Sequence, residues 1–182
     1  RMDRILRRIR KQEIGAPLAP ALDWLATHRP PPPKRRTLVH GDLGPTNFLV
    51  RDGEVRCVLD WSKALLAEPE AEVGFLRASL RTAAIAGLGR WNTLLSWPLG
   101  RIGARVERRL AAERELDPER VRWYETLRSV ALLASVAKRT RPGRGRPHVL
   151  DERRSFSAIC RQLSQLTGTP EPRLPARGSV ID

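Results

Sequence analysis

Residues 37–61, TLVHGDLGPTNFLVRDGEVRCVLDW, decide the fold prediction for this chain. Short apolar runs in this segment predict three β-strands, over residues 37–39, 48–51 and 54–59. Asp52-Gly53 separates the last two runs. An Asp-Gly pair in that position favours a type I′ hairpin turn, because this turn requires positive φ at both central residues. The turn would pair Arg51 with Glu54.

The predicted register assigns side chains to the two faces of the hairpin. Counting back from the turn places Asn47 opposite Val58, with Asp60 one diagonal step further along. Because strand side chains alternate between faces, these three side chains would share one face. The other face would be apolar and part of the core, and it would carry Phe48, Val50, Val55, Cys57 and Leu59.

Three polar residues are expected to meet at one end of this hairpin. Asp42 lies in the loop before it, Asn47 begins it and Asp60 follows it. Two carboxylates and an amide oxygen are the hard ligands that suit Mg²⁺ held together with phosphates, so the segment indicates phosphoryl transfer. Taken singly, such residues more often cap or satisfy a loop, and the functional interpretation depends on their combination.

The order of these residues resembles the aminoglycoside phosphotransferase and choline kinase family. The stretches VHGDLGPTNFLV (39–50) and VLDW (58–61) match its catalytic-loop pattern H-G-D-x-x-x-x-N and its I/L-D-W element. The resemblance implies a kinase-like fold that uses ATP and Mg²⁺. It implies that Asp42 is the catalytic base, that Asn47 and Asp60 are metal ligands, and that His40 supports the loop. In the family an Asp braces the catalytic loop; here the candidate is Glu72, and Glu68 likewise stands where Asp is usual.

A nucleotide-binding lobe is not expected in this chain. Kinases need a glycine-rich phosphate loop and a strand lysine, whereas the residues before His40 suggest helices and a proline run. Lys11 belongs to a basic amphipathic helix rather than to a strand. We therefore expect the chain to be a fragment, the C-terminal catalytic lobe alone, with its nucleotide-contacting residues unknown.

Outside the hairpin, the periodicity of apolar residues is helical. The predicted fold class is mainly α with a small antiparallel β-hairpin (α+β), similar to the C-terminal lobe of the protein-kinase-like fold. The lobe would span residues 1–168, with a proline-rich connector over 29–36 and a disordered tail over 169–182. A basic loop over 139–147 and a loop with Trp91 and Trp97 near the acceptor cleft are also expected. The predicted helices cover residues 2–11, 18–25, 70–86, 99–110, 117–138 and 151–167.

Composition limits the classes of partner. The chain has 34 Lys and Arg against 20 Asp and Glu, a net charge of +14, which attracts polyanions without specifying one. Arginines spread over solvated helix faces explain this excess better than a nucleic-acid site does, although charge alone does not exclude nucleic acid. Two cysteines are too few for a disulfide framework and fit a reducing cytoplasm. No apolar run is long enough to span a membrane.

The sequence supports two functional hypotheses. The first is an ATP-dependent phosphotransferase that moves the γ-phosphoryl group to the hydroxyl of a small molecule, represented here by its catalytic lobe. The alternative is a truncated or degenerate, non-catalytic kinase-like module that binds an anionic partner through its basic surface. Aminoglycosides are polycations, and the charge of +14 disfavours them as acceptors, although a local acidic patch around Glu68, Glu70 and Glu72 would still suit one.

Overall fold

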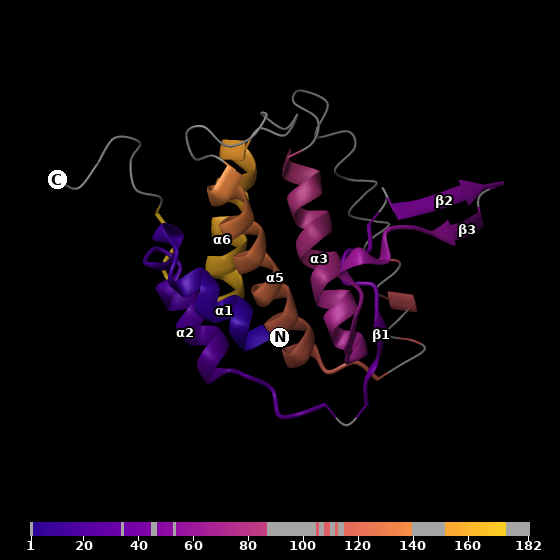
Figure 1. The fold of residues 1–182 in the computed structure, drawn as a ribbon, viewed down its shortest axis with the longest axis horizontal. Helices are drawn as coiled ribbons and strands as arrows, with labels where there is room; N and C mark the ends of the chain where they lie inside the picture. The colour runs from indigo at the N-terminus through magenta and orange to yellow at the C-terminus, as the bar shows by residue number, and fades with distance from the viewer. Residues whose placement is uncertain are drawn as a thin grey trace.

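A computed structural model describes residues 2–33, 35–44, 47–52, 54–86, 105, 108–109, 112, 115–139 and 152–173. This part of the chain is mainly helical, with two small antiparallel sheets (Figure 1). The helices and strands are α1 (Met2–Arg10), the 3₁₀ helix η1 (Glu13–Gly15), α2 (Ala19–Thr27), β1 (Thr37–Val39), β2 (Phe48–Arg51), β3 (Glu54–Val58), the 3₁₀ helix η3 (Trp61–Lys63), β4 (Leu65–Ala67), α3 (Pro69–Ala86), α5 (Pro118–Arg139) and α6 (Glu152–Thr167).

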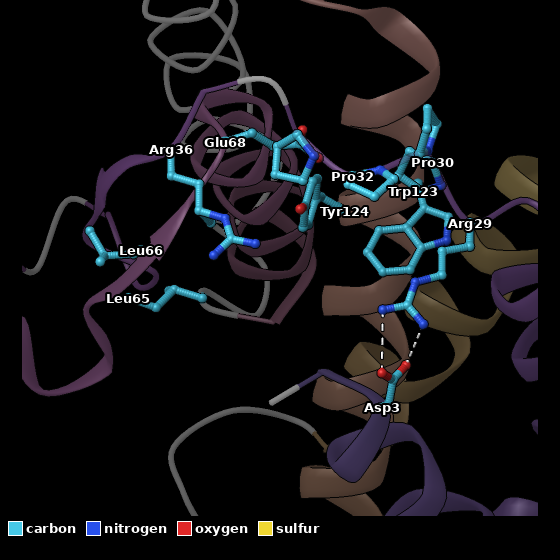
Figure 2. A pocket seen from close by; sticks show the side chains of 13 residues that line it. Asp3, Arg29, Pro30, Pro32, Arg36, Leu65, Leu66, Glu68, Trp123 and Tyr124 are labelled. Carbon is cyan, nitrogen blue, oxygen red and sulfur yellow. Dashed lines mark hydrogen bonds and ion pairs between the residues drawn. The ribbon is translucent and has the colours of Figure 1, made fainter.

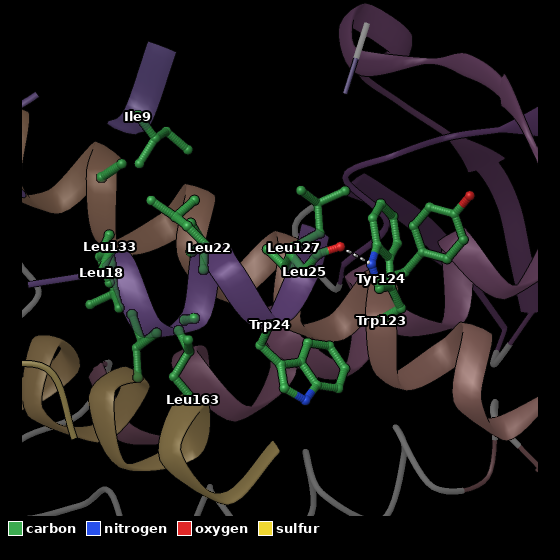
Figure 3. Packing of buried hydrophobic residues seen from close by; sticks show 14 of the residues in the cluster. Ile9, Leu18, Leu22, Trp24, Leu25, Trp123, Tyr124, Leu127, Leu133 and Leu163 are labelled. Carbon is green, nitrogen blue, oxygen red and sulfur yellow. Dashed lines mark hydrogen bonds between the residues drawn. The ribbon is translucent and has the colours of Figure 1, made fainter. Parts of the chain in front are cut away.

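The helices form the body of the molecule around α5. This helix lies between α3 and α6, and α1 and α2 cover the side next to α5 and α6 (Figure 1). Its middle part is buried on most sides, as expected for a helix with neighbours around it, and Val130 and Leu133 are completely buried. Figure 3 shows α2 contributing Leu22 and Leu25 to the same core. The indole N–H of Trp123 donates to the Leu25 carbonyl at 2.9 Å, which satisfies the buried nitrogen.

A glycine sets the spacing of α3 and α5. A Cβ atom at Gly74 would lie 2.7 Å from the backbone N of Glu125, the Cβ of Tyr124 and the backbone O of Val121. Two of these atoms are backbone, so they could move away only with the whole helix. The absence of a side chain at this position therefore allows the two helices to approach closely.

The predicted helices 2–11, 18–25, 70–86, 117–138 and 151–167 are confirmed to within a few residues at their ends. Asp117 caps α5 by accepting the Glu119 N–H at 2.9 Å. Within the predicted helix 99–110 the described residues, Arg105, Arg108 and Arg109, are helical. Trp91, Trp97, residues 140–147 and residues 174–182 lie outside the described residues. No described helix combines the length and the apolar character that crossing a membrane requires.

One strand was not predicted. The sequence after Trp61 was expected to be helical throughout, and this expectation is wrong, because Leu65–Ala67 forms β4 and pairs antiparallel with β1. In this pair Val39 and Ala67 are buried while Leu38 and Leu66 are exposed. Buried and exposed residues therefore alternate regularly along both strands. Because the exposed residues are also apolar, the sequence lacks the alternation of apolar and polar residues that would have predicted β4.

The β2–β3 hairpin has the predicted turn but not the predicted register. Arg51 pairs with Glu54 and Asp52 has a φ of 55°, as a type I′ turn requires. An irregularity between Leu49 and Val50 then shifts the pairing by one residue, so that Phe48 instead of Asn47 lies opposite Val58. The predicted pairing of Asn47 with Val58 is wrong, and Asn47 is bonded to Leu59 instead, whose N–H donates to its carbonyl at 2.8 Å.

The predicted core face of the hairpin is also wrong. Val55, Cys57 and Leu59 are exposed and Phe48 is only half-buried. Figure 1 shows the reason, since β2 and β3 project away from the helices and no described element covers them. Cys160, in contrast, is buried in α6, and both cysteines are free thiols.

Candidate active site

The loop that follows β1 depends on a glycine in a left-handed conformation. Gly41 has a φ of 78°, and a Cβ atom there would lie 2.7 Å from the carbonyl oxygen of Lys63. Any other residue would meet both backbone strain and a clash. The tight turn brings Asp42 next to η3, the segment that follows Asp60.

Glu72 of α3 holds the backbone of this loop. Its carboxylate accepts the N–H of His40 at 2.5 Å and the N–H of Gly41 at 3.4 Å. Burial raises the pKa of the Glu72 carboxyl, and the two N–H donors and the charge of Arg128 oppose that rise. The loop is therefore fixed to the helical core by Glu72, the residue that the sequence suggests as its brace.

His40 connects the loop to the end of β3. Its ring is buried, its Nε2 lies 2.8 Å from the Leu59 carbonyl, and the Asp42 N–H donates to its Nδ1 at 3.3 Å. With Nδ1 as an acceptor, it is Nε2 that donates to the Leu59 carbonyl. The ring centroid of Trp61 lies 4.8 Å from that of His40. These contacts make His40 a structural part of the loop.

Asn47 bridges the loop and the segment before Asp60. Its Nδ2 donates to the Asp42 carbonyl at 2.8 Å, and its backbone carbonyl accepts the Leu59 N–H. The amide nitrogen is therefore committed to the loop. This hydrogen bond fixes the orientation of the amide, whose oxygen is the atom that can coordinate a cation.

Asp60 follows β3 in a left-handed conformation, with a φ of 57°. It is exposed, and its Oδ1 accepts the Ser62 N–H at 3.3 Å. Hydrogen bonds from Ser62 lower the pKa of the Asp60 carboxyl, with a smaller contribution from the charge of Lys63, while the negative charge of Asp42 acts in the opposite direction. The two carboxylates are thus close enough to interact electrostatically.

Two cations bind the carboxylate of Asp42. Lys63 Nζ lies 2.5 Å from Oδ2, and Arg128 Nη2 of α5 contacts Oδ1. The side chain of Lys63 is 53% exposed, whereas those of Arg128 and Asp42 are 16% and 23% exposed. Partial burial would raise the pKa of Asp42, but the hydrogen bonds and charges of Lys63 and Arg128 outweigh it and lower the pKa. Asp42 is therefore ionised at neutral pH.

The donor set at the hairpin end fits Mg²⁺ rather than a metal held by protein alone. Asn47 supplies an amide oxygen and Asp60 a carboxylate, both hard ligands. Among the residues that the structure describes, no three His, Cys, Asp or Glu side chains come together as a metal cluster. Mg²⁺ in phosphoryl-transfer sites needs only one or two protein ligands, because phosphates and water complete its coordination.

Comparison with known proteins identifies the family of this chain. A model of the phosphotransferase enzyme family matches residues 1–124, more than half of the chain. The chain belongs to the phosphotransferase enzyme family. Hygromycin-B 4-O-kinase of Escherichia coli is 38% identical over 60 residues, which are 33% of this chain and 18% of that protein.

Two solved structures of a family member share the fold. Both are thermostable mutants of aminoglycoside phosphotransferase APH(4)-Ia. The apo form matches 90% of this chain and 48% of its own, at 22% identity and a TM-score of 0.57. A ternary complex with ADP and hygromycin B matches 86% and 45% at 23% identity, also with a TM-score of 0.57. The chain thus spans about half the length of these phosphotransferases.

Two residues of the site were missed in the sequence. Lys63 lies three positions after Asp60, and this closeness along the chain is the one signal that could have suggested it. Arg128 is 86 residues away from Asp42 in sequence. It lies on a helix that carries three other arginines, and nothing in the local sequence distinguishes it as the one that contacts the loop.

Proposed function

We propose that the protein is an ATP-dependent phosphotransferase that moves the γ-phosphoryl group to the hydroxyl of a small molecule. Membership of the phosphotransferase family supports this reaction type. The observation that carries the proposal is the Asn47 bridge: its side-chain amide donates to the backbone of Asp42, and its backbone carbonyl accepts the N–H of Leu59, the residue before Asp60. Asn47 thereby holds together the backbone of Asp42 and the backbone next to Asp60.

Asp42 would orient the acceptor hydroxyl and receive its proton. An ionised carboxylate can accept a hydrogen bond from the hydroxyl, and its lowered pKa favours positioning over strong basicity. Lys63 already occupies Oδ2, so an incoming hydroxyl has to share that oxygen or replace the ammonium group. The exposed Lys63 can move, whereas the more buried Arg128 keeps the carboxylate in place.

Asn47 and Asp60 would hold Mg²⁺ on the nucleotide phosphates. When bound, this ion offsets the negative charge that develops on the phosphoryl group. His40 and Glu72 would keep the loop in position through their contacts with its backbone and with Leu59. Positioning and charge stabilisation account for most of the catalysis in this class of reaction.

We also propose that the chain is the catalytic, C-terminal lobe of this enzyme. The described residues before β1 are in helices and loops rather than in a nucleotide-binding sheet. Leu49, Leu59 and Trp61 expose apolar side chains along the hairpin and η3, as expected where another part of the protein covers them. The solved phosphotransferase with ADP and hygromycin B provides the first nucleotide and acceptor to test.

The test is a transfer assay on the full-length protein, with Mg-ATP and a panel of hydroxyl acceptors that includes hygromycin B. Asp42→Asn should lower kcat by at least about 100-fold, the usual effect of removing a positioned acid–base group. Asp23→Asn is the matched control, because this exposed aspartate pairs with Arg10 away from the site. A D42N enzyme that keeps a near wild-type rate would remove the assignment.

Binding experiments on the 182-residue chain separate the enzyme from the non-catalytic module. Saturable binding of Mg-nucleotide that weakens in Asp60→Asn supports the phosphotransferase. Strongly salt-dependent binding of nucleic acid, together with no response to Mg-nucleotide, would instead support a module that uses its arginines.

A further inference from the structure

A pocket lies apart from the proposed catalytic residues. It has a volume of about 680 Å³, and its walls are the connector prolines 30–33, strand β4 and the start of α5 (Figure 2). None of its lining residues belongs to the set His40, Asp42, Asn47, Asp60 and Glu72. Small-molecule sites commonly have volumes of about 300–1,000 Å³ and are lined mainly by apolar groups, with few polar ones. The pocket therefore has the size and the apolar walls of a ligand site.

Most charged groups in the pocket already have partners. Arg29 makes two hydrogen bonds with Asp3, at 2.8 and 3.3 Å. The buried carboxylate of Glu68 is bound by Arg120. The Tyr124 hydroxyl is also hydrogen-bonded to Glu68, and burial together with this carboxylate raises the pKa of the tyrosine.

Arg36 is the exception. It is exposed, and the described part of the chain offers it no hydrogen bond or ion pair. Figure 2 shows its guanidinium group turned toward Tyr124, beside Leu65. Arg36 is therefore the unpaired cation among the described lining residues, beside apolar walls and already paired charges.

We propose that this pocket binds a small monoanion on an apolar body, an aryl or alkyl carboxylate. The carboxylate would form paired hydrogen bonds with the planar guanidinium group of Arg36. The apolar body would lie against the prolines and the rings of Trp123 and Tyr124. A single unpaired cation matches a single negative charge, whereas a dianion such as a phosphate monoester would keep one charge without a partner in the pocket.

Titration calorimetry with naphthalene-2-carboxylate tests the proposal, with the neutral alcohol 2-naphthalenemethanol as the matched probe. The wild-type chain should bind the carboxylate at least about tenfold more tightly than the alcohol, a difference of about 1.4 kcal/mol. Arg36→Gln should remove this preference and leave alcohol binding within about threefold. Arg56→Gln is the control, since this exposed arginine pairs with Glu54 on the hairpin and does not line the pocket.

A second variant tests the place of binding. Leu66→Glu puts a carboxylate on the pocket wall, at a position that is 70% exposed, and should weaken the carboxylate probe more than the alcohol. Leu38→Glu is its control, because Leu38 is the strand partner of Leu66 but is not a lining residue. Equal affinity for the two probes, an unchanged R36Q variant or no detectable binding would each overturn the proposal. All these measurements are independent of catalytic activity, so they do not depend on the proposed phosphotransferase function.

Discussion

The two cations on Asp42 should contribute unequally to stability. We expect a double-mutant cycle between Asp42→Asn and Arg128→Gln to give a coupling free energy of about 2 kcal/mol. The same cycle with Lys63→Gln should give about 0.5 kcal/mol. Exposed ion pairs contribute about 0.2–1 kcal/mol, whereas breaking a buried pair costs about 3–5 kcal/mol.

The exposed fractions of the side chains show where each ion pair of Asp42 falls between the surface and the buried range of energies. Arg128 and Asp42 are 16% and 23% exposed, so their pair lies between the two limits. Lys63 is 53% exposed and belongs to the surface range. The Nε of Arg128 is buried without a hydrogen-bond partner among the described residues, at a cost of about 1 kcal/mol, and glutamine at this position removes that cost. The single variant R128Q should therefore lose less than the coupling energy, and only the cycle isolates the pair.

Urea unfolding followed by circular dichroism at pH 7 measures both cycles. Repeating them at about 0.5 M salt should reduce the Lys63 coupling most, because exposed charges are screened more than buried ones. A Lys63 coupling equal to or larger than that of Arg128 would refute the reasoning from burial. A coupling near zero for both pairs would show that Asp42 is not held by these cations in solution.

Three further predictions concern the core, acid stability and the thiols. Gly74→Ala should lower the free energy of unfolding, measured in urea, by about 2 kcal/mol, since its Cβ atom would be 2.7 Å from atoms of α5. Gly44→Ala is the control: open space surrounds Gly44, so the free energy of unfolding should change by less than about 0.5 kcal/mol. Because the pKa of Asp42 is lowered, its stabilising contribution is present above the ordinary pKa of 3.8 and is lost as the pH falls through the folded-state value. In acid titration the wild-type chain should thus lose more stability than D42N below that pH; parallel curves would contradict this. Ellman's reagent should label the exposed Cys57 rapidly and Cys160 only after unfolding, since burial raises the pKa of Cys160 to about 12. Fast labelling of both thiols would contradict the packing of α6.

Local patterns allowed most of the fold to be predicted. The helix start at Asp117-Pro118 and the Asp-Gly turn depend on interactions within a few residues, and both are where the sequence places them. The register failed beyond Leu49, because an irregularity in a strand is decided by packing rather than by the turn. Strand β4 was missed because its stability comes from pairing with β1, which is distant in sequence.

The candidate site could be predicted in its residue types but not in its charge balance. The spacing of four residues that are close together along the chain identifies them as site candidates: His40, Asp42, Asn47 and Asp60. Their catalytic roles stay predictions. Arg128 reaches Asp42 only because α5 packs beside α3, and no local pattern contains that information.

The close approach at Gly74 has a consequence for how the family can vary. Glu72 lies two residues before this glycine on α3, and Arg128 lies three residues after Glu125 on α5, where the helices touch. α3 therefore holds the backbone of the proposed catalytic loop through Glu72, and α5 holds Asp42 of that loop through Arg128. The packing of the two helices thus sets the distance between these two contacts. Substitutions deep in the α3–α5 interface should consequently alter turnover as well as folding. A larger side chain on one helix should be tolerated only where the facing side chain on the other helix becomes smaller.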